Sequence, residues 1–453
     1  MHNEPVTEPW PKPGVAWYAV SVLLVAFLFS AVDRVILGML IIPIKEDLGV
    51  SDAAMGSLLG VAFAVAFTVT GLLAGWAADR YSRRGIISVA IVIWSLATAA
   101  CGLVTTFTQL LFGRIAVAVG ESALSPAAFS MISDYFEPKR LGRALGVYMS
   151  GAFFGAGISF LVGGAVLGLV GDIGVIHMPL VGDVKFWHIV FLIVGLPGLI
   201  VAVAIMTVPE PTRRGVRKND VSKSAIFRFV SGRWRVYSAH LLGFGSLAVI
   251  IVVVMTWAPT MFVRAHGFSQ AEAGLTLGII MLILSPGGVF AGGWLVDRWQ
   301  RAGYADAPFR VGITASLCSL PFAIAGNIVS DSTLAVALYC PLVFFASLAV
   351  ACGPTAIQLV TPNGFRAQIS AAYLMTLNIL TSTLGATAVG FATDYVFKSE
   401  LAVGKSMALV CGIAGPLAAF LLWSGCRPFR AAVDEEAALA GGEPAAPAFT
   451  ASH

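Results

Sequence analysis

Four ionisable residues lie inside apolar stretches of this sequence: Asp33, Arg34, Arg114 and Glu121. Charged groups are expensive in a hydrocarbon environment, so residues of this kind usually serve binding or proton transfer. Burial disfavours the charged form of a carboxylate, which makes Asp33 and Glu121 candidate proton acceptors. Arginine can hold an anionic group through two parallel hydrogen bonds, so Arg34 and Arg114 are candidate ligands of an anion. The alternative is a buried ion-pair network that only fastens two helices together.

The composition of the chain requires lipid as its main solvent. Of its 453 residues, 58% are hydrophobic and 11% are charged, against about 25% charged residues in soluble proteins. The net charge of +4 offers no case for nucleic acid, and the six cysteines form no CxxC pair that would suggest a metal site. Twelve apolar runs are long enough to cross a bilayer, at roughly 17–42, 54–79, 86–106, 109–135, 142–170, 187–208, 238–263, 272–297, 310–328, 333–361, 367–397 and 404–425.

Polar segments divide the chain into five expected parts. These are an N-terminal segment (1–16), a first six-helix bundle (17–208), a linker with a short amphipathic helix near 225–236 (209–237), a second six-helix bundle (238–425) and a disordered tail (426–453). Most of the 28 lysines and arginines fall on one side of the membrane if both termini and the linker are cytoplasmic. We therefore expect a multi-pass protein of the plasma membrane, in a bacterium the inner membrane.

A repeated motif identifies the two halves. The pattern GWxxDRxxRxG occurs at Gly75–Gly85, after the second apolar run, and at Gly293–Gly303, after the eighth. The glycines allow close helix packing, and each aspartate ends a helix where it can meet an arginine or a helix N-terminus. We expect a cytoplasmic gate formed by these loops and by the pair Asp134 and Arg143, with the motif residues Gly75, Asp79, Arg80, Arg83, Arg84, Gly293, Asp297, Arg298 and Arg301. The alternative is that the basic residues only set the topology.

The repeated motif resembles the signature loop of the major facilitator superfamily, and the resemblance covers about residues 15–425. It implies an all-α fold with twelve transmembrane helices in two pseudo-symmetric six-helix bundles, a central cavity and rocker-switch motion. Several stretches also resemble the Spinster-like transporters, which export lysophospholipids and sphingoid phosphates: Asp33-Arg34, Gly120–Ala123, Ile132–Phe136 and Thr361–Asn363. The charged residues on the first and fourth runs also resemble those of the organic anion:cation symporters, which take up sugar acids with protons.

Helical geometry predicts how the four charges meet. Arg114 and Glu121 are seven residues apart, so they share one face of a helix at a spacing of about 10 Å. Asp33 and Arg34 are neighbours and cannot point the same way. We expect Asp33 to lie beside Arg114 or Glu121, and Arg34 to reach into the cavity or toward the outer gate. Protonation of a carboxylate would then free its arginine for the substrate.

The second half carries no charge at mid-depth. Its interior offers Trp257, Tyr373 and Asn378 as expected substrate contacts, and His240 near a helix start is interpreted as interfacial. One charged wall and one apolar wall fit an amphipathic anion, although apolar walls also occur where small solutes bind.

The leading hypothesis is a secondary active transporter of an amphipathic anion, with protons as the coupling ion and no other cofactor. A proton-coupled symporter of a small sugar acid is the second hypothesis, and a non-transporting membrane sensor is the third. The sequence has neither a P-loop nor a GxSxG elbow, so we expect no ATP-driven step and no enzyme. We expect a monomer whose partners are the substrate and the lipid bilayer.

Overall fold

A computed structural model describes residues 10–171, 175–178, 182–213, 223–362 and 365–439. Twelve helices among these residues are long and apolar enough to cross a membrane, which confirms the prediction of twelve spans. Their apolar side chains are exposed along much of their length, as lipid requires. The predicted all-α class holds, with one short hairpin as an addition.

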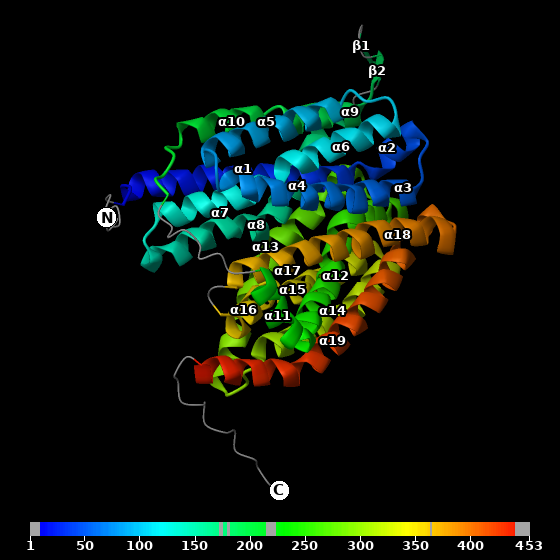
Figure 1. Ribbon diagram of the computed structural model, residues 1–453. Helices are drawn as coiled ribbons and strands as arrows, with labels where there is room; N and C mark the ends of the chain where they lie inside the picture. The colour runs from blue at the N-terminus through cyan, green and yellow to red at the C-terminus, as the bar shows by residue number, and fades with distance from the viewer. Residues whose placement is uncertain (1–9, 172–174, 179–181, 214–222, 363–364, 440–453) are drawn as a thin grey trace. The chain divides into compact units, whose positions relative to one another are not determined.

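The first half and the linker contain the following elements (Figure 1): α1 (Pro13–Met39), α2 (Ile41–Leu48), α3 (Asp52–Ser57), η1 (Leu58–Ala62), α4 (Phe63–Ala78), α5 (Arg83–Cys101), α6 (Phe107–Glu121), α7 (Leu124–Tyr135), α8 (Pro138–Val170), β1 (Ile176–Met178), β2 (Gly182–Val184), α9 (Phe186–Gly195), α10 (Gly198–Thr207) and α11 (Lys223–Gly232). The second half contains α12 (Trp234–His266), α13 (Gln270–Arg301), α14 (Ala307–Ile328), α15 (Ser332–Ser347), α16 (Cys352–Val360), α17 (Arg366–Leu380), η2 (Thr381–Thr387), α18 (Ala388–Phe391), η3 (Ala392–Phe397), η4 (Glu400–Ala402) and α19 (Val403–Leu439).

The described residues fall into two compact units that do not follow the sequence halves. Unit 1 contains the described residues of 1–34, 65–159 and 169–217, and unit 2 contains those of 35–64, 160–168 and 218–453. Two stretches of the first half therefore pack with the second half.

Small residues explain why those two stretches join unit 2. A methyl group on Gly60 of η1 would lie 2.3 Å from Thr387 Oγ1 and 2.4 Å from the carbonyl oxygen of Ser382. On α8, a methyl group on Gly164 would lie 2.9 Å from the backbone nitrogen of Leu275. Only glycine permits backbones to approach this closely, so these positions fix the helix contacts of unit 2.

Each unit has its own core of packed helices. In unit 1, α5 packs against α6, α9 and α10, and a methyl group on Gly195 would lie 2.7 Å from the backbone nitrogen of Ala99. In unit 2, α19 lies along α12 and α14 (Figure 1), and the rings of Phe309 and Phe429 pack with centroids 4.5 Å apart.

Two spans are broken at corresponding places. The fourth span stops helix α6 at Glu121 and resumes with α7 at Leu124, and the tenth span stops α15 at Ser347 and resumes with α16 at Cys352. A proline follows each break within the next turn, Pro126 in one half and Pro354 in the other. Broken helices free backbone groups near the middle of a span, which is where transporters bind solutes.

One expectation needs correction. The tail expected to be disordered from residue 426 is helical as far as Leu439, because α19 continues and its acidic end pairs with the linker. Arg233 binds Glu435 at 2.8 Å and Glu436 at 2.7 Å. A β-hairpin of β1 and β2 also interrupts the loop between α8 and α9, paired from Ile176 with Val184 to Met178 with Gly182.

Candidate functional site

The structure brings Asp33, Arg34, Arg114 and Glu121 together in unit 1, and we call these four residues the ionic cluster. The Nε atom of Arg34 on α1 donates to Oε2 of Glu121, the last residue of α6, at 2.5 Å. Asp33, Arg114 and Glu121 are all at most 3% exposed, whereas the side chain of Arg34 is 42% exposed. Arg34 is therefore the accessible side chain of the cluster.

Asp33 faces the fourth span, as the sequence predicts. Its carboxylate lies within electrostatic range of Glu121 and Arg114 and beside Thr98 of α5. Arg114 Nη1 lies 3.5 Å from the backbone carbonyl oxygen of Asp33. Arg34 differs from expectation because it pairs with Glu121 and also covers the ring of Phe67 at 4.8 Å. Neighbouring residues of α1 thus approach Glu121 from two directions.

The cluster is balanced in charge and incomplete in hydrogen bonds. Two carboxylates face two guanidinium groups, so the fully ionised cluster is neutral. Among the described residues, Asp33 Oδ1 and Glu121 Oε1 have no hydrogen-bond partner. A proton added to either carboxylate would leave one positive charge in excess, which an anion could neutralise.

The three expected substrate contacts of the second half have different environments. Trp257 is fully buried and its Nε1 donates to the carbonyl oxygen of Ala386 at 2.9 Å, so it packs α12 against η2 and does not line an open space. Tyr373 is 6% exposed. Asn378 is half-buried, and its Oδ1 lies 3.5 Å from Ser382 Oγ. Asn378 is the most accessible of the three.

His240 was interpreted as interfacial, but it is buried in unit 2. Its Nε2 lies 2.8 Å from the carbonyl oxygen of Gly353, in the first turn after the break of the tenth span. Its ring also lies 4.8 Å from that of Tyr373, measured between centroids. The imidazole of His240 therefore donates to a backbone carbonyl group in the first turn of α16.

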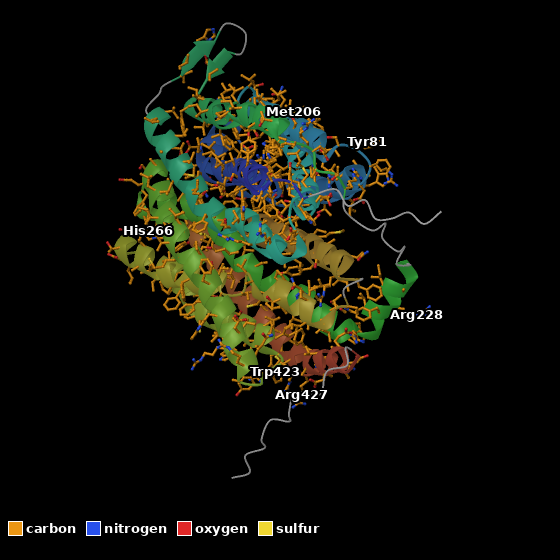
Figure 2. All side chains as sticks on the ribbon, turned by 90° about the vertical axis from the view of Figure 1, so that its left-hand side faces the viewer. Tyr81, Met206, Arg228, His266, Trp423 and Arg427 are labelled. Carbon is orange, nitrogen blue, oxygen red and sulfur yellow. The ribbon has the colours of Figure 1, made fainter. Side chains whose placement is uncertain are left out.

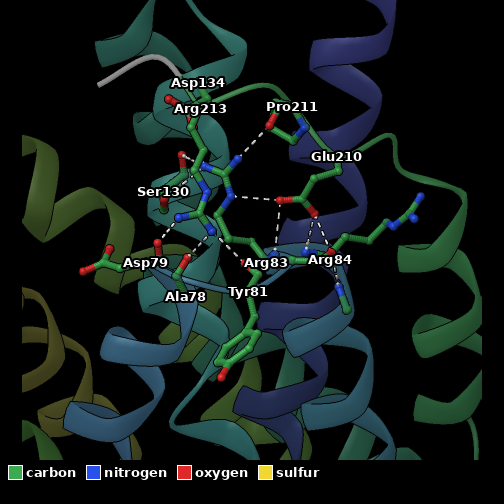
Figure 3. A network of polar contacts seen from close by, with 12 residues as sticks. Ala78, Asp79, Tyr81, Arg83, Arg84, Ser130, Asp134, Glu210, Pro211 and Arg213 are labelled. Atoms are coloured by element: carbon green, nitrogen blue, oxygen red, sulfur yellow. Dashed lines mark hydrogen bonds and ion pairs between the residues drawn. The ribbon is translucent and has the colours of Figure 1, made fainter. Parts of the chain in front are cut away.

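The first motif copy forms a dense ion network (Figure 3). Arg83 is 1% exposed, and it pairs with Asp134 of α7 and with Glu210 after α10, the latter at 3.0 Å. It also donates to the carbonyl oxygen of Pro211 at 2.7 Å and to Ser130 Oγ at 3.1 Å. One arginine thus joins the start of the third span to the ends of the fourth and sixth spans.

Glu210 was missed by the sequence analysis. Its carboxylate accepts from the backbone N–H groups of Arg83 at 3.1 Å and Arg84 at 2.9 Å, and from Ser82 Oγ at 2.9 Å. Burial alone would raise the pKa of Glu210, but these hydrogen bonds and that of the Arg83 side chain lower the pKa below its ordinary value. Glu210 is therefore a charged anchor for the first motif loop.

The other gate residues of the first half take different partners from those expected. Arg213, in the linker, donates to the backbone carbonyl groups of Ala78, Asp79 and Tyr81 (Figure 3). The side chains of Asp79 and Arg80 are exposed, with Arg80 over the ring of Trp76 at 4.3 Å. Arg143 lies over the ring of Trp17 at 5.6 Å, and Asp134, its expected partner, pairs with Arg83.

The second motif copy keeps the local geometry but not the network. Arg298 covers Trp294 at 5.5 Å, as Arg80 covers Trp76. Arg301 donates to the carbonyl oxygen of Asp297 within its own helix, at 3.2 Å. A methyl group on Gly75 or Gly293 would meet no atom within 4 Å. Close packing at these glycines, which we expected, is absent among the described residues.

A second charged cluster in unit 2 ties a stretch of the first half to the second half. Asp52, the first residue of α3, is fully buried and accepts from Arg264 at 2.7 and 2.9 Å. Lys45 of α2 lies 3.1 Å from Asp52 and 2.8 Å from Glu400, and Arg264 lies 3.7 Å from Glu400. We call Lys45, Asp52, Arg264 and Glu400 the latch.

Comparison with known proteins settles the family of the chain. The sequence model of the Major Facilitator Superfamily matches residues 22–386. The chain belongs to the Major Facilitator Superfamily. It is accordingly a membrane transporter and not an enzyme, and its twelve spans make it a multi-pass protein of the plasma membrane.

Two relatives and one solved structure resemble this chain along most of its length. An MFS-type efflux pump of Mycolicibacterium smegmatis (strain ATCC 700084 / mc(2)155) is 26% identical, over 94% of this chain and 96% of its own. The hexuronate transporter of Bacillus subtilis (strain 168) is 26% identical, over 86% of this chain and 92% of its own. The fold matches the inward-facing, unoccupied crystal structure of a bacterial homologue of the human lysosomal transporter Spinster, with a TM-score of 0.81 at 23% identity, over 93% and 99% of the two chains.

Proposed function

We propose that this transporter moves an organic anion together with protons by alternating access. The observation that carries the proposal is the ionic cluster, in which the reachable Arg34 is held at 2.5 Å by the buried Glu121. An ion pair of this kind has two states: closed, with Arg34 on Glu121, and open, with Glu121 protonated and Arg34 on the anion of the solute. Proton and anion then bind together, because protonation of Glu121 leaves the positive charge of Arg34 unbalanced and the anion neutralises it.

The position of the cluster supports this role. Glu121 is the last residue before the break of the fourth span, so a change in its charge acts at the weakest point of that span. Arg114 and Asp33 would hold the remaining charges in balance while Arg34 changes partner. We also propose that both termini are cytoplasmic, since the basic linker and both motif loops would then lie on the inside.

An amphipathic anion, such as a lysophospholipid or a sphingoid phosphate, is our first candidate solute. In unit 2, α17 exposes Leu374, Met375 and Ile379 around the half-buried Asn378. Such a surface could accommodate an apolar tail, and the amide of Asn378 could hydrogen-bond a polar linkage of the solute.

A small sugar acid is the second candidate, favoured by the likeness to the hexuronate transporter of Bacillus subtilis along 92% of that protein. A carboxylate suits Arg34 as well as a phosphate does, because both accept two parallel hydrogen bonds. The two candidates differ in the tail and not in the charge.

Uptake into proteoliposomes separates the candidates. We would reconstitute the full chain and measure uptake of a radiolabelled lysophospholipid and of glucuronate, each with an inward proton gradient and with the gradient collapsed by an ionophore. We expect saturable uptake of the lysophospholipid that falls when the gradient is collapsed. Saturable uptake of glucuronate alone would establish the second candidate. Uptake that is the same with and without the proton gradient would contradict proton coupling.

A further inference from the structure

A pocket of about 860 Å³ opens in unit 2, where the end of α13 and the start of α14 meet residues 423–430 of α19. Its charged lining consists of Arg310, Arg427, Arg430 and Asp306, and Trp423 and Tyr304 supply aromatic walls. The volume falls within the range of about 300–1,000 Å³ that is typical of sites for small organic ligands. The ionic cluster belongs to unit 1, so this pocket is a different site.

One buried carboxylate orients two of the arginines. Asp306 is fully buried, and its Oδ1 accepts from Arg310 Nε at 2.8 Å. The Nε atom of Arg430 lies 3.5 Å from Oδ2 of the same group. The side chains of Arg310 and Arg430 remain 39% and 45% exposed, so guanidinium N–H groups stay available toward the pocket.

The third arginine gives the pocket its excess of charge. Arg427 is exposed and has no ion-pair partner among the described residues. With Asp306 balancing one guanidinium, two positive charges remain without a balancing carboxylate in the lining. A ligand with a compact negative charge would satisfy them, and phosphate suits the guanidinium fork best.

Aromatic residues place the pocket at the boundary between lipid and water. Trp423 is 67% exposed and stands where the apolar part of α19 gives way to its basic turn; Figure 2 shows Trp423 and Arg427 close together at this end. Tyr304 is 44% exposed and lies under Arg310 at 4.4 Å. Exposed indole and phenol rings are typical of the headgroup level of a bilayer.

We infer that this pocket binds the phosphate-bearing headgroup of an anionic phospholipid. Arg427 and Arg430 contact the phosphate, Arg310 closes the pocket beside them, and Trp423 packs against the glycerol and the first acyl carbons. The pocket also includes Trp299 of the second motif copy, so a bound lipid touches the end of α13 that carries Asp297 and Arg298. This inference does not depend on the substrate of the transporter.

Binding to the purified full chain tests the inference. The probes are dioctanoyl phosphatidylglycerol, dioctanoyl phosphatidylcholine and inorganic phosphate, each titrated while the thermal unfolding midpoint is measured and bound lipids are counted by native mass spectrometry. We compare the unchanged chain with the double variant Arg427→Gln/Arg430→Gln. The matched control is Arg228→Gln, an exposed arginine of α11 outside the pocket.

We expect phosphatidylglycerol to raise the unfolding midpoint saturably and the double variant to weaken its binding by at least about tenfold, because two charge-assisted contacts are lost. Arg228→Gln should bind as the unchanged chain does. Phosphatidylglycerol binding that is equal in the double variant would overturn the inference. Protection by inorganic phosphate equal to that by the lipid would overturn the lipid as source and assign the pocket to a soluble phosphate.

Discussion

Glu121 faces Arg34 at 2.5 Å, and its amide analogue can neither accept a proton nor hold the guanidinium as a charge pair. Glu121→Gln should therefore lower gradient-driven uptake by at least about tenfold. Exchange of labelled for unlabelled solute without a gradient should persist, because Arg34 remains free to bind the anion. The measurement is uptake into proteoliposomes in both modes.

A matched control is Glu46→Gln, which removes an exposed carboxylate that has no ion pair among the described residues. Its uptake should equal that of the unchanged chain in both modes. If Glu121→Gln keeps full gradient-driven uptake, the ionic cluster is only a structural fastening of α1 to α6.

Glu210 makes stability depend on pH in a definite direction. Hydrogen bonds outweigh burial and lower its pKa below the ordinary 4.5, so its contribution is complete above that pH and is lost as the pH falls through the lowered pKa. Glu210→Gln should destabilise the chain by about 1–3 kcal/mol at neutral pH, a range that allows for the partial exposure of Glu210. The difference in unfolding midpoint from the unchanged chain should shrink below pH 4.5.

The exposed Glu137, at the same end of unit 1, supplies the control. Glu137→Gln should leave the midpoint and its pH dependence unchanged. A Glu210→Gln variant whose deficit is the same at every pH would show that packing, and not the charge of Glu210, supports Arg83.

The sequence reveals the ionic cluster because its four residues interrupt apolar runs. It does not reveal Glu210, Asp52 or Arg264, since charged residues at helix ends look like ordinary solvated positions. Their importance comes from burial, which depends on which loop folds over which helix end. The sequence also misassigns Trp257, because an aromatic residue on a span has the same signature whether it lines a cavity or packs between helices.

At the level of elements, two glycines differ in the space that a methyl group would find. Gly60 lies against η2 without room for a methyl group, whereas Gly75 has open space around it. Gly60→Ala should destabilise the chain by about 1–3 kcal/mol, as overpacking does. Gly75→Ala should be neutral or stabilising by up to about 1 kcal/mol, since alanine is the better helix former. Thermal unfolding of the two variants checks both signs.

Uptake then tests whether Gly75 belongs to a gate. If the first motif loop closes in another state of the cycle, Gly75→Ala should lower the uptake rate while its unfolding midpoint is preserved. Full uptake by Gly75→Ala would leave the first motif loop with a structural role only, held by Arg83, Glu210 and Arg213.

Element boundaries could be predicted only in part. The spans follow from apolar length, but the breaks after Glu121 and Ser347 do not, because glycine and proline are common along all of these helices. The π-helical segments η1 and η2 have no residue signature, since they arise from the way the two segments pack. The end of α19 was assigned to a disordered tail because Glu435 and Glu436 look solvated until Arg233 pairs with them.

For the molecule as a whole, the positive charges predict the side of the membrane that each end faces. Fusion of a green fluorescent protein to the C-terminus should give fluorescent cells, and fusion of alkaline phosphatase there should give no enzyme activity. At a cytoplasmic end the green fluorescent protein fluoresces, whereas alkaline phosphatase stays inactive. The reverse pair of results would invert the proposed orientation.

The latch bears on alternating access. Within unit 2 it joins residues 45 and 52 of the first sequence half to residues 264 and 400 of the second, so a cycle that separates the halves at this end must break it. Asp52→Asn leaves Arg264 without its buried partner, and Arg264→Gln leaves Asp52 with Lys45 alone. Each should lower the unfolding midpoint, and each should change the uptake rate.

A double-mutant cycle separates the latch from unrelated damage. Because both substitutions remove the same contact, the combined variant Asp52→Asn/Arg264→Gln should lose less stability than the sum of the two single losses, with a coupling of about 0.5–3 kcal/mol. Lys405→Gln, an exposed charge of α19 outside the latch, should show no coupling with Asp52→Asn. Strict additivity of Asp52→Asn and Arg264→Gln, in stability and in uptake alike, would mean that the two ends of the latch do not act as a unit and that the cycle does not depend on breaking it.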